Sequence, residues 1–168
     1  RSYYGGHYGT TNNDHYDLFS ANGVDFIALY FQYDTSMPTA KLNWANNLLH
    51  TYSNRHAMVF THNMGNSSTP VNVSGQGNKL YTALRTNANL FLMHGGHVSG
   101  EGRRTNVFRG HTVYILVADY QSRDNGGNGW MRLYHFSSGK DIIQAITYSP
   151  WLNQYETDGN SQFKLPLP

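Results

Sequence analysis

The first half of the chain alternates between apolar runs and amphipathic stretches. Residues 24–31 form a nearly continuous apolar run, which predicts a strand buried on both faces. Beyond Pro38, which suits the start of a helix, apolar residues recur at helical spacing and predict an amphipathic helix that ends by Ser53. Shorter elements follow, namely a strand at 57–60, a helix around 80–84 and a strand at 90–93. This alternation predicts an α/β fold.

The second half of the chain has a different pattern. Apolar runs separated by turns rich in Gly, Asn, Ser and Asp predict a β meander. The tail shows no apolar period, so it is expected to be irregular from about residue 151, and residues 1–22 predict a loop or short edge strands. We expect a single domain spanning residues 1–168. The runs of the meander are 107–108, 112–118, 130–136 and 142–148, and its turns lie at 109–110, 125–129 and 137–140.

Composition limits the chemistry that the chain can perform. It contains no cysteine, which excludes disulfides, thiolate metal sites and cysteine nucleophiles. Nine histidines remain, so any metal site must use imidazole, carboxylate or amide ligands. A charge of +2 without a Lys/Arg stripe gives no reason to expect a nucleic-acid site. No apolar run approaches the roughly 20 residues of a membrane helix, so we expect no membrane partner.

Two histidines follow apolar strands directly. His62 comes after the run at 57–60, and His97 comes after the run at 90–93 with Gly95 and Gly96 in between. The helix between these strands makes a strand–helix–strand unit, whose two strands are expected to be parallel and neighbouring. Both imidazoles then emerge at the edge of the sheet where ligand sites gather. On spacing alone, two unrelated histidines at strand ends remain the alternative to a metal site.

Several segments resemble one family of enzymes. Residues 57–62 and 92–102 resemble the last two motifs of the calcineurin-like metallophosphoesterases, in which one strand ends in a lone metal-binding histidine and a later strand ends in Gly-His-x-His. Residues 1–8 and 118–130 are similar to a secreted, bacterial-type branch of that family. The resemblance covers nearly the whole chain but only the later half of the catalytic domain. It implies the C-terminal half of an α/β/β/α sandwich with two metal ions at the strand ends.

The resemblance implies that His62 and His97 are ligands of one divalent transition metal ion, such as Mn, Fe or Zn. Ser99 stands where the family has a further histidine ligand, and Glu101 or water is the candidate substitute. The upstream motifs Asp-x-His, Gly-Asp and Gly-Asn-His have no counterpart here, and no role is transferred to His7. The catalytic residue is therefore unknown.

Other residues near these motifs are candidates for contacts to phosphate or to the metal ligands. The alternative for His94 is a packed or solvent-facing side chain. The stretch from Glu101 to Arg104 could contact phosphate through arginine, or it could form a solvated hairpin. Asp119 is expected either to brace the loop beside the site or to cap a turn. The candidates for contacts to phosphate or the ligands are Asn63, His94, Ser99, Glu101 and Arg104.

The sequence leads to one functional hypothesis and one alternative. The hypothesis is metal-dependent hydrolysis of phosphate esters by a longer protein, in which this chain supplies part of the metal site. The chain alone is expected to be inactive, because two cations about 3.5–4 Å apart need a bridging carboxylate. The alternative is a non-catalytic module that binds a glycan or another protein.

The same resemblance sets expectations about partners and location. The expected partners are a phosphate ester and the missing N-terminal half of the domain, with a homo-oligomer as a further candidate, because half a sandwich exposes its core. Two glycosylation sequons, the absence of cysteine and the family likeness favour a secreted or extracellular protein.

Overall fold

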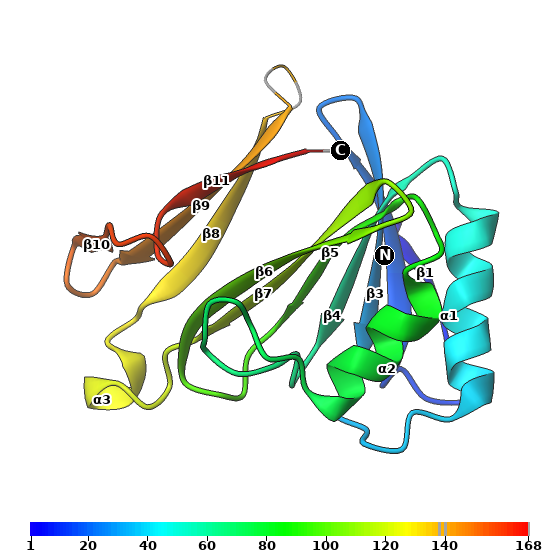
Figure 1. The fold of residues 1–168 in the computed structure, drawn as a ribbon, viewed down its shortest axis with the longest axis horizontal. Helices are drawn as coiled ribbons and strands as arrows, with labels where there is room; N and C mark the ends of the chain where they lie inside the picture. The colour runs from blue at the N-terminus through cyan, green and yellow to red at the C-terminus, as the bar shows by residue number, and fades with distance from the viewer. Residues whose placement is uncertain (138, 140, 168) are drawn as a thin grey trace.

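The computed structural model describes residues 1–137, 139 and 141–167. It is a mixed α/β structure with a seven-stranded sheet and a four-stranded sheet (Figure 1). The strands are β1 (Tyr4–His7), β2 (His15–Ala21), β3 (Val24–Phe31), β4 (His56–Thr61), β5 (Leu90–Gly95), β6 (Gly100–Phe108), β7 (His111–Asp119), β8 (Met131–Ser137), β9 (Ile142–Ser149), β10 (Gln154–Glu156) and β11 (Phe163–Pro166), and the helices are α1 (Thr39–Thr51), α2 (Gly75–Leu84) and α3 (Asp124–Gly127).

The larger sheet confirms the predicted α/β alternation. Its strand order is β1-β2-β3-β4-β5-β7-β6, and the strands predicted at 24–31, 57–60 and 90–93 are β3, β4 and β5. β3, β4, β5 and β7 run parallel, while β1, β2 and β6 pair antiparallel at the two sides. α1 connects β3 to β4 and α2 connects β4 to β5, because parallel neighbours need a crossover.

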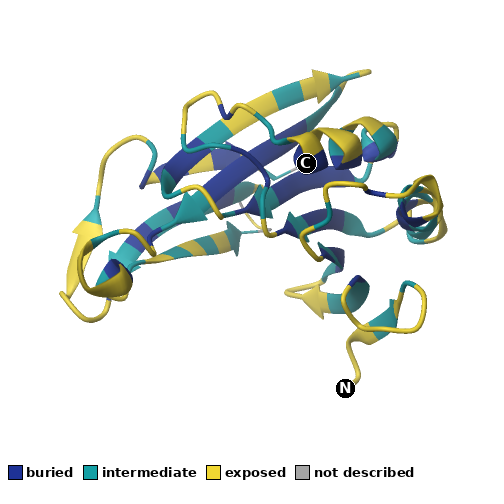
Figure 2. Ribbon diagram, turned by 90° about the horizontal axis from the view of Figure 1, so that it is seen from below, coloured by how far each residue is buried: buried dark blue, intermediate teal, exposed yellow. Residues whose placement is uncertain are grey.

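Two apolar cores lie on opposite faces of this sheet. On one face, side chains such as Ile27 and Val59 pack with Leu49 of α1 and Leu80 of α2. On the other face, residues such as Phe91 pack against the four-stranded sheet. Alternate positions along each central strand therefore enter different cores, which explains why these strands read as continuous apolar runs. Figure 2 shows the buried positions concentrated in the central strands and the exposed ones towards the edges.

The expected meander is wrong in its arrangement, because its strands divide between two sheets. β6 and β7 pair in the large sheet, whereas β8 pairs with β9 in the small one. Between them the chain turns at α3, where Asn125 and Gly126 take left-handed backbone conformations. Regular strand periods do not reveal which sheet a strand joins. Residues 138 and 140 of the turn predicted at 137–140 lie outside the described residues.

The expectation of an irregular tail is also wrong, because β10 and β11 both pair with β9. In β11 the buried Phe163 and Leu165 alternate with the exposed Lys164 and Pro166. Polar residues and Pro166 interrupt these short strands, whereas the four-residue runs at 57–60 and 90–93 are apolar throughout. Residues 1–22 form the short edge strand β1 and the longer β2. No helix in the described ranges has the length and apolar character needed to cross a membrane.

Candidate metal centre

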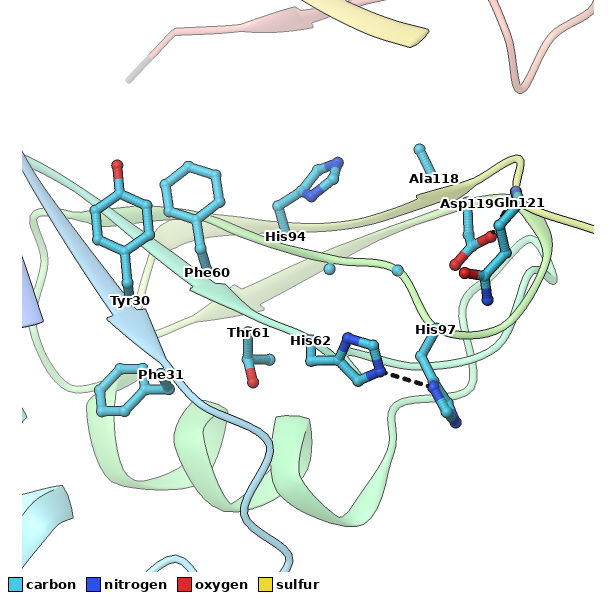
Figure 3. Close-up of a pocket in the computed structure, with 12 residues that line it drawn as sticks. Tyr30, Phe31, Phe60, Thr61, His62, His94, His97, Ala118, Asp119 and Gln121 are labelled. Atoms are coloured by element: carbon cyan, nitrogen blue, oxygen red, sulfur yellow. Dashed lines mark hydrogen bonds between the residues drawn. The ribbon is translucent and has the colours of Figure 1, made fainter. Parts of the chain in front are cut away.

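The two histidines singled out by the sequence meet at one edge of the large sheet. β4 ends at Thr61 and β5 ends at Gly95, and the two strands are parallel neighbours with Phe60 opposite His94. The ring atoms His62 Nε2 and His97 Nδ1 lie 2.8 Å apart (Figure 3). The predicted adjacency of the strands and the convergence of the two side chains are therefore confirmed.

The backbone between the two histidines is held by close contacts. A Cβ atom at position 95 would lie 2.5 Å from the carbonyl oxygen of Thr61 and 2.8 Å from the Cβ of Met64, so only glycine fits there. The Gly96 amide donates to the His62 carbonyl at 3.0 Å. His97 has a φ of 71°, a left-handed conformation that is uncommon outside glycine and tends to gather at functional sites.

The histidine pair forms part of the wall of a pocket of about 510 Å³. On the side away from the pair, Tyr30, Phe60 and His94 project in a row from the opposite face of the sheet (Figure 3). The exposed Tyr33 ring stands beside the pair, with its centroid 5.8 Å from that of His62 and 6.0 Å from that of His97. The imidazoles are thus accessible while their backbones are fixed.

Asp119, at the end of β7, lines this pocket together with Gln121, at the end opposite the row of Tyr30 and Phe60 (Figure 3). Its Oδ1 accepts a hydrogen bond of 3.1 Å from the Gln121 amide, which is the turn-capping role weighed from the sequence. The carboxylate also reaches the pocket, since a Cβ at Gly96 would lie 3.3 Å from Asp119 Oδ2. The sequence indicates that Asp119 braces this loop or caps a turn, but its place in the pocket depends on the pairing of β7 beside β5.

Glu101, the candidate substitute for the missing histidine, lies elsewhere. Its carboxylate accepts hydrogen bonds from Tyr120 at 2.5 Å, Thr147 at 2.8 Å and Ser161, and forms a 2.5 Å ion pair with Arg132. The reason is register: Glu101 pairs with Ala118 on the face that packs against the small sheet. The expectation that Glu101 supports the site directly is therefore wrong.

The network around Glu101 changes its ionisation. Burial by itself would raise the pKa of the Glu101 carboxyl. The hydroxyl donors of Ser161 and Tyr120 and the charge of Arg132 together outweigh burial, so the pKa lies below its usual value. The carboxylate is therefore held in its charged form between the two sheets. This interaction joins β6 of the large sheet to β8 and β9 of the small one.

His94 and Arg104 also lie away from the histidine pair. The His94 ring faces the small sheet, 5.5 Å from the Tyr134 ring, and its buried Nε2 has no hydrogen-bond partner within the described residues. Burial, followed by the charge of Arg132, lowers the pKa of His94 to about 4, so the ring is neutral at pH 7. Arg104 is exposed, and its Nε donates a hydrogen bond of 2.8 Å to Asn106 Oδ1. This agrees with the alternative that Arg104 belongs to a solvated hairpin.

Asn63 and Ser99 flank the two histidines in the sequence. Asn63 Oδ1 is buried, and no partner for it is found in the part of the chain that the structure describes. Thr61 Oγ1, on the other side of His62, has the same property. Ser99 is partly exposed and directly precedes β6. Ser99 and Asn63 remain candidates for contacts to a ligand.

The donor set fits one part of a metal site. Two nitrogen ligands in neighbouring positions of an octahedral shell lie about 3 Å apart when each bond is about 2.1 Å long. The 2.8 Å separation of the imidazole nitrogens needs only a small opening to reach that value. Within the described residues, no further imidazole nitrogen or carboxylate oxygen lies within 4.8 Å of both histidine nitrogens. A group of three ligand residues with this spacing is found elsewhere, at Glu101, Glu156 and Asp158.

Comparisons with known proteins place the fold in context. No family model matches the chain. It is 31% identical over 182 aligned residues to the uncharacterized protein YvnB of Bacillus subtilis (strain 168), and the alignment covers 98% of this chain but 14% of YvnB. Among solved structures it is similar to GAP50, the anchor in the inner membrane complex of Plasmodium, with a TM-score of 0.57 and 14% identity over 92% of this chain and 54% of GAP50. The chain thus shares an α/β fold with a segment of a larger protein.

Proposed function

We propose that the chain is the C-terminal part of a calcineurin-like metallophosphoesterase domain, which hydrolyses phosphate esters as part of a longer protein. The observation that carries the proposal is the convergence of His62 Nε2 and His97 Nδ1 to 2.8 Å at the ends of two parallel strands. The match to YvnB, of which the chain covers 14%, supports only the placement of the chain within a longer protein. The α/β/β/α arrangement is part of this proposal: α1 and α2 form one outer layer, and the layer over the small sheet would come from the rest of the domain.

In this proposal His62 and His97 occupy two neighbouring coordination positions of a metal ion. The metal would supply hydroxide near neutral pH and neutralise charge on the phosphoryl oxygens. The chain's own contribution is to orient two imidazoles that are fixed by Gly95 and by the amide of Gly96. The bridging carboxylate that a two-metal centre needs would come from the preceding part of the domain.

The proposal is tested by comparing two forms of the protein. A longer protein that includes the preceding part of the domain should hydrolyse bis(4-nitrophenyl) phosphate when supplied with Mn²⁺ or Zn²⁺. The 168-residue chain by itself should show no rate above that of buffer containing the metal, because the barrier to phosphate ester hydrolysis is too high for a partial site. Robust hydrolysis by the isolated chain, or none by the longer protein, would count against the proposal.

A second candidate function is a non-catalytic binding or assembly module. Two observations favour it: Ser99 replaces one expected ligand, and the similar structure, GAP50, is an anchor. In this case the longer protein would bind no transition metal and would show no hydrolysis. Elemental analysis of the longer protein distinguishes the two functions before any substrate is known.

A further inference from the structure

The pocket beside the histidine pair is larger than a phosphate group needs. It extends from the aromatic row at Tyr30 and Phe60, past the glycine pair, to Asp119 and Gln121 (Figure 3). If phosphate binds at the histidines, as the proposed function holds, the organic part of an ester must lie along one arm of this pocket. One arm is aromatic and the other ends in a carboxylate and a carboxamide.

The Asp119 carboxylate lines the same pocket as His62 and His97. An ionised carboxylate only accepts hydrogen bonds, so it binds hydroxyl or ammonium groups and repels further negative charge. Oδ1 is engaged by the Gln121 amide, while Oδ2 lies towards Gly96. A Cβ at position 96 would lie 3.3 Å from both Asp119 Oδ2 and the Ala118 carbonyl oxygen, so a larger residue there would crowd the Asp119 carboxylate.

The segment that carries Asp119 and Gln121 is held in place by contacts of Tyr120, Arg123 and Gly127. The Tyr120 side chain between them points into the core and donates to Glu101 at 2.5 Å. Arg123 stacks over the Tyr120 ring at 4.7 Å and pairs with Glu156 at 2.6 Å. Gly127 packs against the Tyr120 carbonyl, where a Cβ would lie 2.9 Å from the oxygen. A recognition group held by such a network is preorganised, which improves selectivity.

We propose that the Asp119 carboxylate and the Gln121 carboxamide form a subsite for a hydrogen-bond-donating group, a hydroxyl or an ammonium, on the alcohol part of the phosphate ester. This inference rests on the proposed function for the position of the phosphate. It names the substrate class as phosphate esters of hydroxylated or amine-bearing alcohols. Esters with a second negative charge near Asp119 are disfavoured by the same carboxylate.

The test uses binding, so that it does not depend on turnover. The longer protein, loaded with Mn²⁺, is titrated by calorimetry with dimethyl phosphate, with methyl glycerol phosphate and with methyl phosphoethanolamine. The first diester lacks a donor group, the second adds hydroxyls and the third adds an ammonium. The wild type should bind at least one of the two donor-bearing diesters about tenfold more tightly than dimethyl phosphate, the range expected for a hydrogen bond to a charged group.

Two variants of Asp119 separate charge from shape. Asp119→Ala should reduce the preference to within about twofold, while Asp119→Asn, which keeps the shape, should lose the preference for ammonium and retain part of that for hydroxyl. Asp124→Asn removes an exposed carboxylate of the same loop that does not line the pocket, and it should keep the wild-type preference.

The outcomes are decisive for the subsite. Equal, measurable affinity of the wild type for the three diesters overturns the subsite alone, whereas no detectable binding of any diester overturns the phosphate site and the subsite together. Retention of the preference in Asp119→Ala also overturns the subsite. Selective binding without hydrolysis would instead contradict the proposed hydrolase and leave the subsite standing, so the two failures are distinguishable.

Discussion

At the scale of single residues, the structure depends on buried charges with specific partners. Lys41 of α1 is buried, and its ammonium lies 2.8 Å from a carboxylate oxygen of Asp14 and 2.8 Å from one of Asp34. Asp34 also accepts hydrogen bonds from Ser36 and Met37 at the turn before α1. These contacts lower the pKa of Asp34, with the Lys41 bond as the largest cause. Lys41 thus joins the segment before β2 to the start of α1.

Replacing Lys41 with methionine should destabilise the fold strongly. The substitution keeps the buried stem but leaves two carboxylates without their cation, and breaking a buried pair costs about 3–5 kcal/mol. Urea unfolding followed by circular dichroism measures the loss. Lys164→Met, at an exposed position of β11, is the matched control and should change stability by about 0.5 kcal/mol or less. Equal stability of the Lys41 variant and wild type would show that the pair contributes nothing.

At the scale of elements, β5 carries residues with different roles on its two faces. Met93 enters the core beneath the helices, whereas His94 faces the small sheet between the rings of Phe60 and Tyr134. The strand then ends at the glycines that precede His97. β5 and the loop after it thus carry the neutral, partly buried imidazole of His94 and the exposed candidate ligand His97.

His94 should make stability depend on pH. Its pKa is about 4 in the folded chain and about 6.5 in an unfolded one, so the unfolded state takes up a proton first as pH falls. The stability that His94 provides is present above about pH 6.5 and is lost as pH falls towards 4. His94→Phe should flatten this part of the curve of unfolding free energy against pH. An unchanged slope between pH 6.5 and 4 would refute the assignment.

The sequence predicts the strands that are uninterrupted apolar runs, and it misses strands that contain many polar residues. β3, β4 and β5 follow from near-continuous apolar runs, and this places His62 and His97 correctly at one edge. β6 was expected only at 107–108, because an edge strand that pairs with β7 along residues 100–108 can carry polar side chains on its exposed positions.

The position of Glu101 was beyond sequence reasoning. Its partners Arg132 and Ser161 are 31 and 60 residues away along the chain, and they meet it only because the small sheet folds over the large one. Asp119 entered the pocket for a similar reason, since β7 inserts between β5 and β6. Contacts that depend on the order of strands in a sheet cannot be predicted from the local pattern of a single sequence.

At the scale of the whole molecule, the small sheet exposes apolar side chains on its outer face. In β8 the inward Arg132, Tyr134 and Phe136 alternate with outward residues, of which Met131 is 40% exposed and Leu133 is 45% exposed. Trp151 and Tyr155, which follow β9, are exposed by 77% and 61%. Exposed apolar surface of this kind favours association. It is consistent with a proposed outer layer supplied by the rest of the domain.

The isolated 168-residue chain should therefore associate with itself. Light scattering coupled to size exclusion should give a mass above the 19.0 kDa of one chain. The double substitution Met131→Lys and Leu133→Lys should shift the distribution towards the monomer, whereas Val107→Lys, at an exposed position of the large sheet, should not. A monodisperse wild-type monomer would contradict this prediction.

The central claim is that His62 and His97 bind a metal ion in the longer protein. Equilibrium dialysis against Mn²⁺ or Zn²⁺ followed by elemental analysis measures it directly. The wild type should retain bound metal, the His62→Ala/His97→Ala variant should lose at least one ion per chain, and His135→Ala, an exposed histidine of β8, should match the wild type. A metal-free wild type, or an unchanged metal content in the double variant, would contradict the account.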